Sequence, residues 1–406
     1  MTQRESLVTH LRYPIASDGA LEPPAEWARL RARCPAAPVT LPSGDAATLV
    51  TRYADVKAVL ADPRFTRPSR GRGARVADVE SGGVFNSEMG NVLPQHGEGH
   101  LRWRRMIGKW FTAKRMIALR PAVEAMAEQL IDDMVATGAP ADLKACLGFP
   151  LPVWVICDML GVPDADRERF ARWSDMLLSM TRFTEAEMAD AQREFGDYMA
   201  GHIAAKRASP GDDLLSALIA ERDADGEPLS DRILSATGIG LLVAGHETTA
   251  NMIGKMVGML LADRGRWEEL VADRSLVRTA VEEALRMDAN AGFGMLRYLT
   301  EDLEVAGEVL ASGTTAVCSM AAANRDERAF TAAGEMDLRR SPNPHLAFGA
   351  GAHACLGQPL ARTELQAVLD VLLRKLPSLA LAVDVDDLRR VEGLVVGGLK
   401  ELPVRW

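Results

Sequence analysis

The chain contains few cysteines, and none of them forms a paired motif. Its 406 residues include five cysteines, with no Cys-x-x-Cys pair among them. This scarcity excludes a disulfide framework and a zinc-finger pattern. The sequence also lacks a basic-then-apolar leader, low-complexity segments and internal repeats. We therefore expect a single domain over residues 1–406, located in the cytoplasm.

An excess of positive charge is also missing. Lys and Arg number 47 against 56 Asp and Glu, which gives a formal net charge of −9. An acidic balance argues against a nucleic-acid binder that relies on overall positive charge. Hydrophobic residues make up 48% of the chain and charged residues 25%, which is typical of a globular protein. We expect a monomer with no nucleic-acid partner.

Apolar residues recur mostly at helical spacing. The pattern predicts an amphipathic helix over 120–136 and further helices over 162–180, 184–207, 213–222 and 357–375. Strand-like segments are short, and they cover 39–41, 48–53, 303–309, 314–320, 379–383 and 393–404. The fold class predicted from these patterns is mainly α with a small β portion, in the α+β class.

One predicted helix is unusually long. It begins at Ser230-Asp231 and continues without proline to about Leu261. At this length it spans roughly 45–50 Å. Polar residues in its second half, including His246, Glu247 and Lys255, argue against a membrane span, and we expect no membrane insertion. Such a helix must pass through the middle of the protein. Polar residues are unusual there, so their presence needs an explanation.

A glycine-rich loop surrounds Cys355. Gly349, Gly351 and Gly357 flank this cysteine, and a helical pattern with Pro359 near its first turn follows directly. The positive end of a helix favours thiolate over thiol. Glycines allow a flat, bulky group to approach the backbone closely. The segment therefore predicts a thiolate ligand for a planar metal cofactor.

Three other interpretations of this loop are weaker. The spacing Gly349-x-Gly351-x-x-Ala354 matches a dinucleotide fingerprint, but no clear strand of a βαβ unit precedes it. Zinc would need two more ligands besides Cys355 and His353, and none stands at a suitable spacing. An inert buried cysteine is the usual alternative, and the density of glycines argues against it.

The stretch 348–357, which reads FGAGAHACLG, resembles the haem-binding loop of the cytochrome P-450 superfamily at every fixed position. The resemblance extends over essentially the whole chain. It implies the cytochrome P-450 fold, with the long central helix crossing the haem. It also implies that Cys355 is the axial ligand of the iron in haem b, held in a loop with Phe348, Gly349 and Gly357. A thiolate ligand favours O–O cleavage, so the expected activity is that of a haem-thiolate monooxygenase.

The same resemblance assigns roles elsewhere. It implies a structural triad of Glu283, Arg286 and Arg340, and haem-propionate contacts from His100, Arg104, Arg297 and His353. Two departures from the family pattern are residues 329–333, where an acidic, proline-containing turn is usual, and the individual segment 84–96.

In the long helix, the resemblance implies that Ala244 and Gly245 leave room for O2 and that Glu247 and Thr248 deliver protons to it. A zinc-protease motif is excluded because position 250 is Ala250 instead of histidine. A threonine within a helix ordinarily bonds back to a carbonyl one turn earlier, and this alternative for Thr248 stays open.

Electrons are expected from NAD(P)H through a ferredoxin and its reductase, since 406 residues leave no room for a fused flavin reductase. Arg102, Arg105 and Lys109 occupy the helix face opposite His100 and Arg104. They are a candidate ferredoxin-docking patch, with a solvated helix face as the alternative.

The expected substrate is a medium-sized, mostly apolar small molecule of secondary metabolism, which is hydroxylated or epoxidised. The residues expected to line its cavity are Phe85, Met180, Phe183, Leu241, Phe293, Met295 and Val395. Carbon–carbon or carbon–nitrogen coupling and desaturation remain alternatives. A non-catalytic haem sensor or carrier is a third, and the Glu247-Thr248 pair argues against it.

Overall fold

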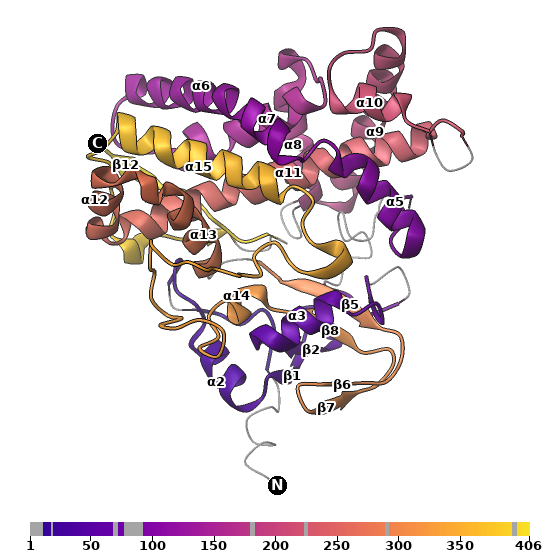
Figure 1. Ribbon diagram of the computed structural model, residues 1–406, viewed down its shortest axis with the longest axis vertical. Coiled ribbons are helices and arrows are strands. Elements are labelled where there is room, and N and C mark those ends of the chain that lie inside the picture. Colours follow the sequence, from indigo (N-terminus) through magenta and orange to yellow (C-terminus); the bar gives the residue numbers. More distant parts are fainter. Residues whose placement is uncertain are drawn as a thin grey trace.

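A computed structural model describes residues 11–17, 19–67, 72–76, 92–178, 183–222, 226–288, 292–391 and 396–406. The α-helices of the described residues are α2 (Ala25–Arg33), α3 (Tyr53–Ala61), α5 (Gly97–Gly108), α6 (Ala113–Thr137), α7 (Pro150–Met159), α8 (Arg167–Leu178), α9 (Glu185–Ala208), α10 (Leu214–Ala220), α11 (Asp231–Leu261), α12 (Arg264–Ala272), α13 (Val277–Met287), α14 (Met320–Ala323) and α15 (Gln358–Lys375). Most of the helices gather in the upper part of the molecule, and the main sheet lies in the lower part together with α2, α3 and α14 (Figure 1). This arrangement confirms the predicted fold class.

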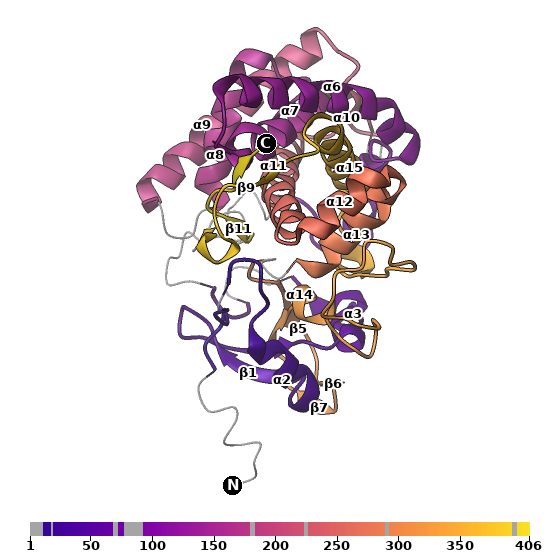
Figure 2. The same ribbon diagram turned by 90° about the vertical axis from the view of Figure 1, so that its left-hand side faces the viewer.

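Helix α11 runs through the centre of the helical part (Figure 2). The Ser230 hydroxyl accepts the Ile233 N–H at 3.3 Å and so caps the first turn, as the sequence predicts. The helix has 31 residues and is about 46 Å long. It packs against α7, α8, α9 and α15, and every residue from Thr249 to Leu261 is buried. Because other helices pack around it, α11 is apolar on most of its faces.

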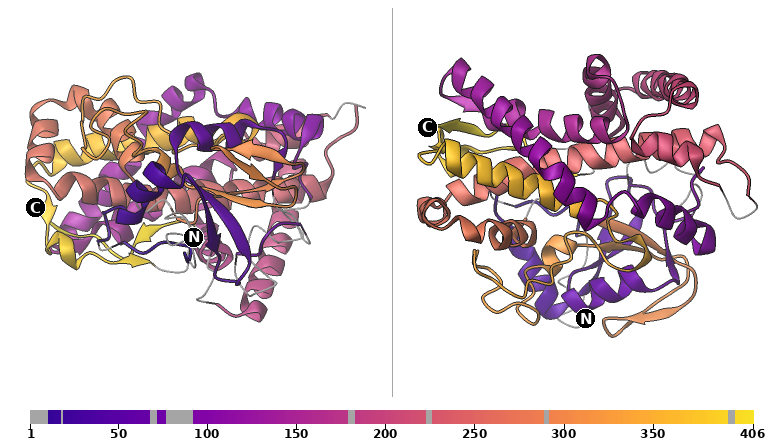
Figure 3. Two further views of the ribbon diagram at one scale, coloured as in Figure 1. Left: turned by 90° about the horizontal axis from the view of Figure 1, so that it is seen from below. Right: turned by 45° about the horizontal axis from the view of Figure 1, so that its top comes forward.

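The other predicted helices also form, with shifted ends. The helix predicted over 120–136 begins earlier, at Ala113, because the Thr112 hydroxyl accepts the Arg115 N–H at 3.4 Å. Residues 179–180 of the helix predicted over 162–180 lie outside the described residues. Helix α15 runs alongside α6 (Figure 3). No helix in the described part of the chain has both the length and the apolarity needed to cross a membrane.

The main sheet has five strands in the order β1-β2-β8-β5-β3, and only the β2–β8 pair is parallel. Neighbouring positions alternate between its faces. Val50 and Cys318 contribute to a second hydrophobic cluster with α3, whereas Leu49 and Val317 contribute to a third cluster with Tyr13. The sheet therefore carries core on both faces. Its strands are β1 (Ala36–Thr40), β2 (Ala46–Val50), β3 (Phe65–Thr66), β5 (Met295–Leu299) and β8 (Thr315–Cys318).

Most predicted strands form with shifted ends: that over 39–41 covers 36–40, that over 314–320 ends at Cys318 before α14 begins at Met320, and that over 379–383 is only Ala380–Leu381. Two further predictions differ more. The strand predicted over 48–53 ends at Val50, and Tyr53 instead begins α3, where its N–H donates to the Asp326 carboxylate at 3.0 Å. The strand predicted over 303–309 is a hairpin of β6 (Leu303–Val305) and β7 (Glu308–Leu310). It turns at Ala306 and Gly307, which both have positive φ.

The remaining strands form smaller sheets near the carboxyl end. They are β4 (Ala141–Asp142), β9 (Ala380–Leu381), β10 (Arg390–Val391), β11 (Gly398–Leu399) and β12 (Pro403–Arg405). Strand β12 lies between β4 and β9, and β10 pairs with β11. Residues 393–395 of the strand predicted over 393–404 fall outside the described residues.

Candidate active site around the cysteine loop

The loop before α15 is folded tightly around Cys355. The Cys355 N–H donates to the Phe348 carbonyl at 2.7 Å, and Arg104 of α5 donates to the Ala354 carbonyl at 2.6 Å. Gly351 has φ +70°, and a Cβ atom there would lie 2.6 Å from the Ala61 Cα atom of α3. This close approach requires glycine. Helices α3, α5 and α15 thus all hold the loop.

The surroundings of Cys355 act on its thiol in opposite directions. Cys355 is exposed, yet desolvation by the neighbouring protein raises the pKa of its thiol. The backbone N–H groups of Gly357 and Gln358 and the charges of Arg104 and Arg362 lower this pKa. Desolvation is the larger effect, so the net shift of the pKa is upward, and the N–H groups at the start of α15 and the two arginines offset part of it by stabilising negative charge on sulfur.

Cationic and imidazole side chains converge beside the loop. His100 and Arg297 are buried, and the rings of His100 and His353 lie 4.3 Å apart. Desolvation and the nearby arginines lower the pKa of His100 to about 4 and that of His353 to about 3. Arg104 completes the predicted set at the Ala354 carbonyl. The four predicted propionate-binding residues therefore gather around one region.

The sequence analysis missed two members of this group, Arg67 and His96. Desolvation and repulsion by Arg297 and Arg104 lower the pKa of Arg67 to about 10, and the His96 ring lies 6.0 Å from that of His353. No motif marks Arg67. It joins the site because β3 and β5 are antiparallel, with Phe65 opposite Leu299, so the next positions place Arg67 opposite Arg297.

The hydrogen-bond acceptors of these arginines indicate which kind of group the site would bind. Within the described residues, Arg67 donates to the Gln95 side-chain amide, and Arg104 and Arg297 donate to backbone carbonyls. None of these acceptors carries the negative charge that a group of partly buried cations requires. The two propionates of a haem would supply such charge, and Cys355 would supply the iron ligand. The residues present therefore fit a haem.

Comparisons with known proteins agree with this geometry. The sequence model of the family described as Cytochrome P450 matches residues 168–387, which is more than half of the chain. Nocardicin C N-oxygenase from Nocardia uniformis subsp. tsuyamanensis is 43% identical over 398 residues, covering 97% of this chain and 98% of that protein. The chain belongs to the cytochrome P450 family.

Other relatives place this P450 among bacterial monooxygenases. Mycinamicin IV hydroxylase/epoxidase from Micromonospora griseorubida is 41% identical over 396 residues, covering 97% of this chain and 98% of that protein. The solved structure of the mixed-function P450 MycG has a TM-score of 0.87 at 40% identity, covering 97% of this chain and 99% of that one. The structure of the putative thioether synthase SgvP has a TM-score of 0.91 at 38% identity, covering 98% of this chain and 100% of that one. The cofactor is accordingly haem iron, which works with O2 and supplied electrons.

The central turn of α11 presents Ala244 and Thr248 on one exposed face. The Thr248 hydroxyl donates to the Ala244 carbonyl at 2.8 Å, so it adopts the ordinary back-bonded conformation. Glu247 is buried instead, and its Oε1 atom accepts from Asn251 at 2.8 Å. A Cβ atom at Gly245 would lie 3.2 Å from the Ile156 side chain of α7, which gives this glycine a helix-packing role. The predicted acid and alcohol are therefore adjacent in sequence, but they face different surroundings.

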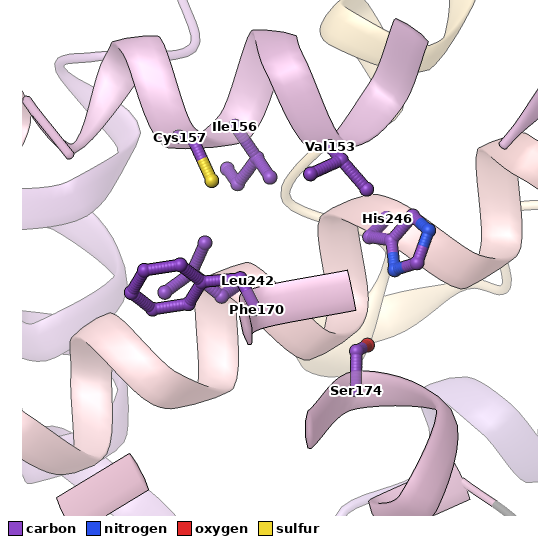
Figure 4. Close-up of a pocket in the computed structure, with 7 residues that line it drawn as sticks. All are labelled: Val153, Ile156, Cys157, Phe170, Ser174, Leu242 and His246. Carbon is purple, nitrogen blue, oxygen red and sulfur yellow. The ribbon is translucent and has the colours of Figure 1, made fainter. Parts of the chain in front are cut away.

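His246 lies on the other side of α11 from Thr248, because residues two apart in a helix differ by about 200°. It is 2% exposed, and its ring packs edge-on against Phe149 at 4.3 Å. Burial lowers the pKa of His246 to about 3, so it is neutral. Figure 4 shows the pocket that it lines with Val153, Ile156, Cys157, Phe170, Ser174 and Leu242. His246 therefore belongs to the contact of α11 with α7 and α8.

The predicted structural triad is assembled as expected from the sequence. Arg286 donates to both Glu283 oxygens, at 2.7 and 2.8 Å, and Arg340 donates to the same carboxylate at 3.1 Å. Neither Glu283 nor Arg286 has any exposed surface. Further Arg286 donors bond to the carbonyls of Asn324 and Ala333. The triad thereby fastens α13 to the segment that leads into the cysteine loop.

The described residues of the predicted substrate cavity lie in different places. Phe183 and Leu241 pack against the large helical core, and Met295 packs against the second cluster. Phe293 is buried in the third cluster, where its ring meets Tyr13 at 4.9 Å and its carbonyl accepts the Tyr13 hydroxyl at 2.6 Å. Three predicted members lie outside the described residues, namely Phe85, Met180 and Val395.

Arg102 and Arg105 of the candidate docking patch are exposed on α5 and Lys109 is exposed directly after it, but two of these three charges are paired. Arg105 bonds to Glu98 at 2.6 Å, and Lys109 bonds to Glu221 at 2.5 Å. Sequence spacing identified the exposed face of the helix. It gave no sign of the partner at Glu221, which lies 112 residues away in the chain.

Glu364 of α15 is a buried acid near the site that the sequence analysis missed. It is 1% exposed, and burial raises the pKa of its carboxyl to about 8, against a smaller opposite effect of the neighbouring Thr249 side chain. Thr249 belongs to α11 and directly follows Thr248. The sequence gave no signal for this acid, because its position in an amphipathic helix looks ordinary.

We predict that Glu364→Gln changes how stability depends on pH. An unfolded glutamate titrates near 4.5 and the native one near 8, so the native carboxyl keeps its proton while the unfolded one loses it. The wild type therefore loses about 1.4 kcal/mol of stability per pH unit inside this window as pH rises. Glutamine does not titrate, so the variant does not lose stability in this way. The free energy of unfolding of the variant relative to wild type should therefore differ little at pH 4.5 and increase towards pH 8.

Urea unfolding of the haem-loaded proteins at several pH values measures this difference. The exposed Glu304→Gln variant serves as the control and should show no such trend. A difference between Glu364→Gln and wild type that is constant from pH 4.5 to 8 would contradict the prediction.

Proposed function

We propose that this P450 oxidises a mostly apolar small molecule of secondary metabolism, with Cys355 as the iron ligand and electrons delivered from NAD(P)H by a ferredoxin and its reductase. The observation that carries the proposal is the meeting of Cys355, at the start of α15, with the cation group of Arg67, Arg104 and Arg297. Haem held by a cysteine thiolate activates O2, since the thiolate donates electron density to the iron and favours O–O cleavage.

The chain supplies binding and proton handling around that cofactor. The three arginines and the imidazoles of His100 and His353 hold the propionates. The backbone N–H groups at the start of α15 stabilise the sulfur. Thr248 holds a proton at the exposed face of α11, and Glu247 is the ionisable group that replenishes it. In this arrangement, Glu247 must rotate away from Asn251 to reach the Thr248 hydroxyl.

The relatives support oxygen insertion as the outcome. Among them are proteins named nocardicin C N-oxygenase and mycinamicin IV hydroxylase/epoxidase. Bond formation without oxygen insertion is a second candidate, favoured by the likeness to the putative thioether synthase SgvP. A screen of natural-product scaffolds for a substrate-induced change in the haem spectrum identifies the substrate. Product mass then separates the two outcomes, because insertion adds one oxygen atom whereas coupling or desaturation removes hydrogen.

We predict that Thr248→Ala uncouples NADPH consumption from product formation. Without the hydroxyl, protons no longer arrive in a controlled way, and electrons leave as hydrogen peroxide. Product yield per NADPH should fall about tenfold or more. Thr248→Ser, which keeps a hydroxyl, should retain most of the coupling. The assay uses a surrogate ferredoxin and reductase and measures NADPH, peroxide and product together. Unchanged coupling in Thr248→Ala would show that protons arrive by another route.

We predict that Arg102→Glu slows reduction by the ferredoxin about tenfold at low salt, because an acidic partner would meet a reversed charge. Arg102 is exposed on α5, the helix whose Arg104 touches the cysteine loop. Arg105 is paired with Glu98, so Arg105→Glu should have a smaller effect. High salt should shrink both differences. Stopped-flow reduction measures the rates, with the exposed Lys400→Glu as the control. Equal rates of reduction by ferredoxin for Arg102→Glu and wild type would contradict the proposed docking patch.

A further inference from the structure

Arg362 of α15 is fixed on several sides next to the cysteine loop. Its Nε and Nη2 atoms donate to the two oxygens of Glu282 in α13, at 2.7 and 3.0 Å. Its Nη1 atom donates to the Gln358 side chain at 2.9 Å. A bidentate pair of this kind sets both the position and the plane of the guanidinium group. This arginine was not among the residues that the sequence singled out.

The guanidinium group also lies against Phe348. Its central carbon is 4.5 Å from the centre of the Phe348 ring, within the range of a cation–π interaction. Phe348 in turn accepts the Cys355 N–H through its carbonyl at 2.7 Å. Arg362 is therefore connected to the cysteine by a ring contact followed by one backbone hydrogen bond.

His345 completes the arrangement. Its Nδ1 atom accepts the Ala347 N–H at 3.2 Å, so the ring proton resides on Nε2, which lies 3.0 Å from a Glu282 oxygen and donates to it. Although burial opposes ionisation of Glu282, hydrogen bonds from His345 and Arg362 lower its pKa to about 2. Glu282 thus stays negative at neutral pH, and it partly offsets the charge of Arg362.

We propose that Arg362 is a positioning residue that holds Phe348 against the cysteine loop and raises the reduction potential of the iron, with Glu282 moderating its charge. The inference rests on Cys355 being the iron ligand. A positive charge near the iron favours the ferrous over the ferric state, and a negative charge does the opposite. The charge of Arg362 lies close to the cysteine loop, since its guanidinium carbon is 4.5 Å from the centre of the Phe348 ring and the Phe348 carbonyl accepts the Cys355 N–H.

The two members of the ion pair give opposite predictions. Arg362→Gln removes the positive charge and should move the midpoint potential to a more negative value. Glu282→Gln leaves Arg362 uncompensated and should move the potential to a more positive value. Arg362→Lys keeps the charge but loses the planar fork, so its potential should stay closer to wild type than that of Arg362→Gln. A purely structural clamp would not shift the potential in opposite directions for the two partners.

Mediated spectroelectrochemical titration of the haem-loaded proteins measures these potentials. Arg374→Gln is the matched control. It also breaks an arginine–glutamate pair of α15, with Glu128, but lies 12 residues further along the helix, roughly 18 Å away. Its potential should equal that of wild type. Shifts of the same sign in Arg362→Gln and Glu282→Gln, or no positive shift in Glu282→Gln, would overturn the inference.

The carbon-monoxide adduct of each reduced protein separates this inference from the assignment of the iron ligand. A red-shifted Soret band in every variant shows that thiolate ligation is intact, so that the potentials test Arg362 alone. Absence of that band in the wild type would contradict Cys355 as the ligand instead.

Discussion

The structure of the site depends on holding one sulfur atom among groups that stabilise negative charge. The cysteine loop closes through the bond from Cys355 to the Phe348 carbonyl, and Arg104 bonds to the neighbouring Ala354 carbonyl. The close approach of Gly351 to α3 sets the other edge of the loop. Helices distant in sequence are thereby brought to one point. The buried triad around Glu283 fastens the segment before the loop in the same way.

A second constraint comes from positive charge gathered beside the cysteine loop, where Arg297 is buried, Arg104 half-buried and Arg67 exposed. Desolvation together with repulsion by Arg297 and Arg104 lowers the pKa of Arg67, and desolvation together with repulsion by nearby arginines lowers the pKa of His100 and His353. Burying like charges without a counter-charge is costly, so the folded chain gains most when an anionic group lies between them. A bound haem would meet this need with its two propionates, and Cys355 would be available as the ligand of its iron. Cofactor binding should therefore stabilise the fold as well as provide the chemistry.

The parts of this site that depend on residues close together in the sequence could be predicted from the sequence. A serine cap and a long apolar run predicted α11 with its observed first residue, Asp231, and a glycine-rich loop before a helix identified Cys355. Features that arise from distant contacts were not predictable. Arg67 enters the site through the register of β3 on β5, and Glu364 becomes unusual only because α11 covers it. Likewise, Gly245 is explained by the approach of α7.

The assignment of Cys355 as the iron ligand is tested most directly by the carbon-monoxide difference spectrum of the reduced protein. Ligation by Cys355 predicts a red-shifted Soret band for the wild type, loss of that band in Cys355→Ser, and its retention in Cys146→Ser, where a half-buried cysteine elsewhere is changed. A wild-type adduct that absorbs like a histidine-ligated globin, or a Cys355→Ser protein that keeps the red-shifted band, would contradict it.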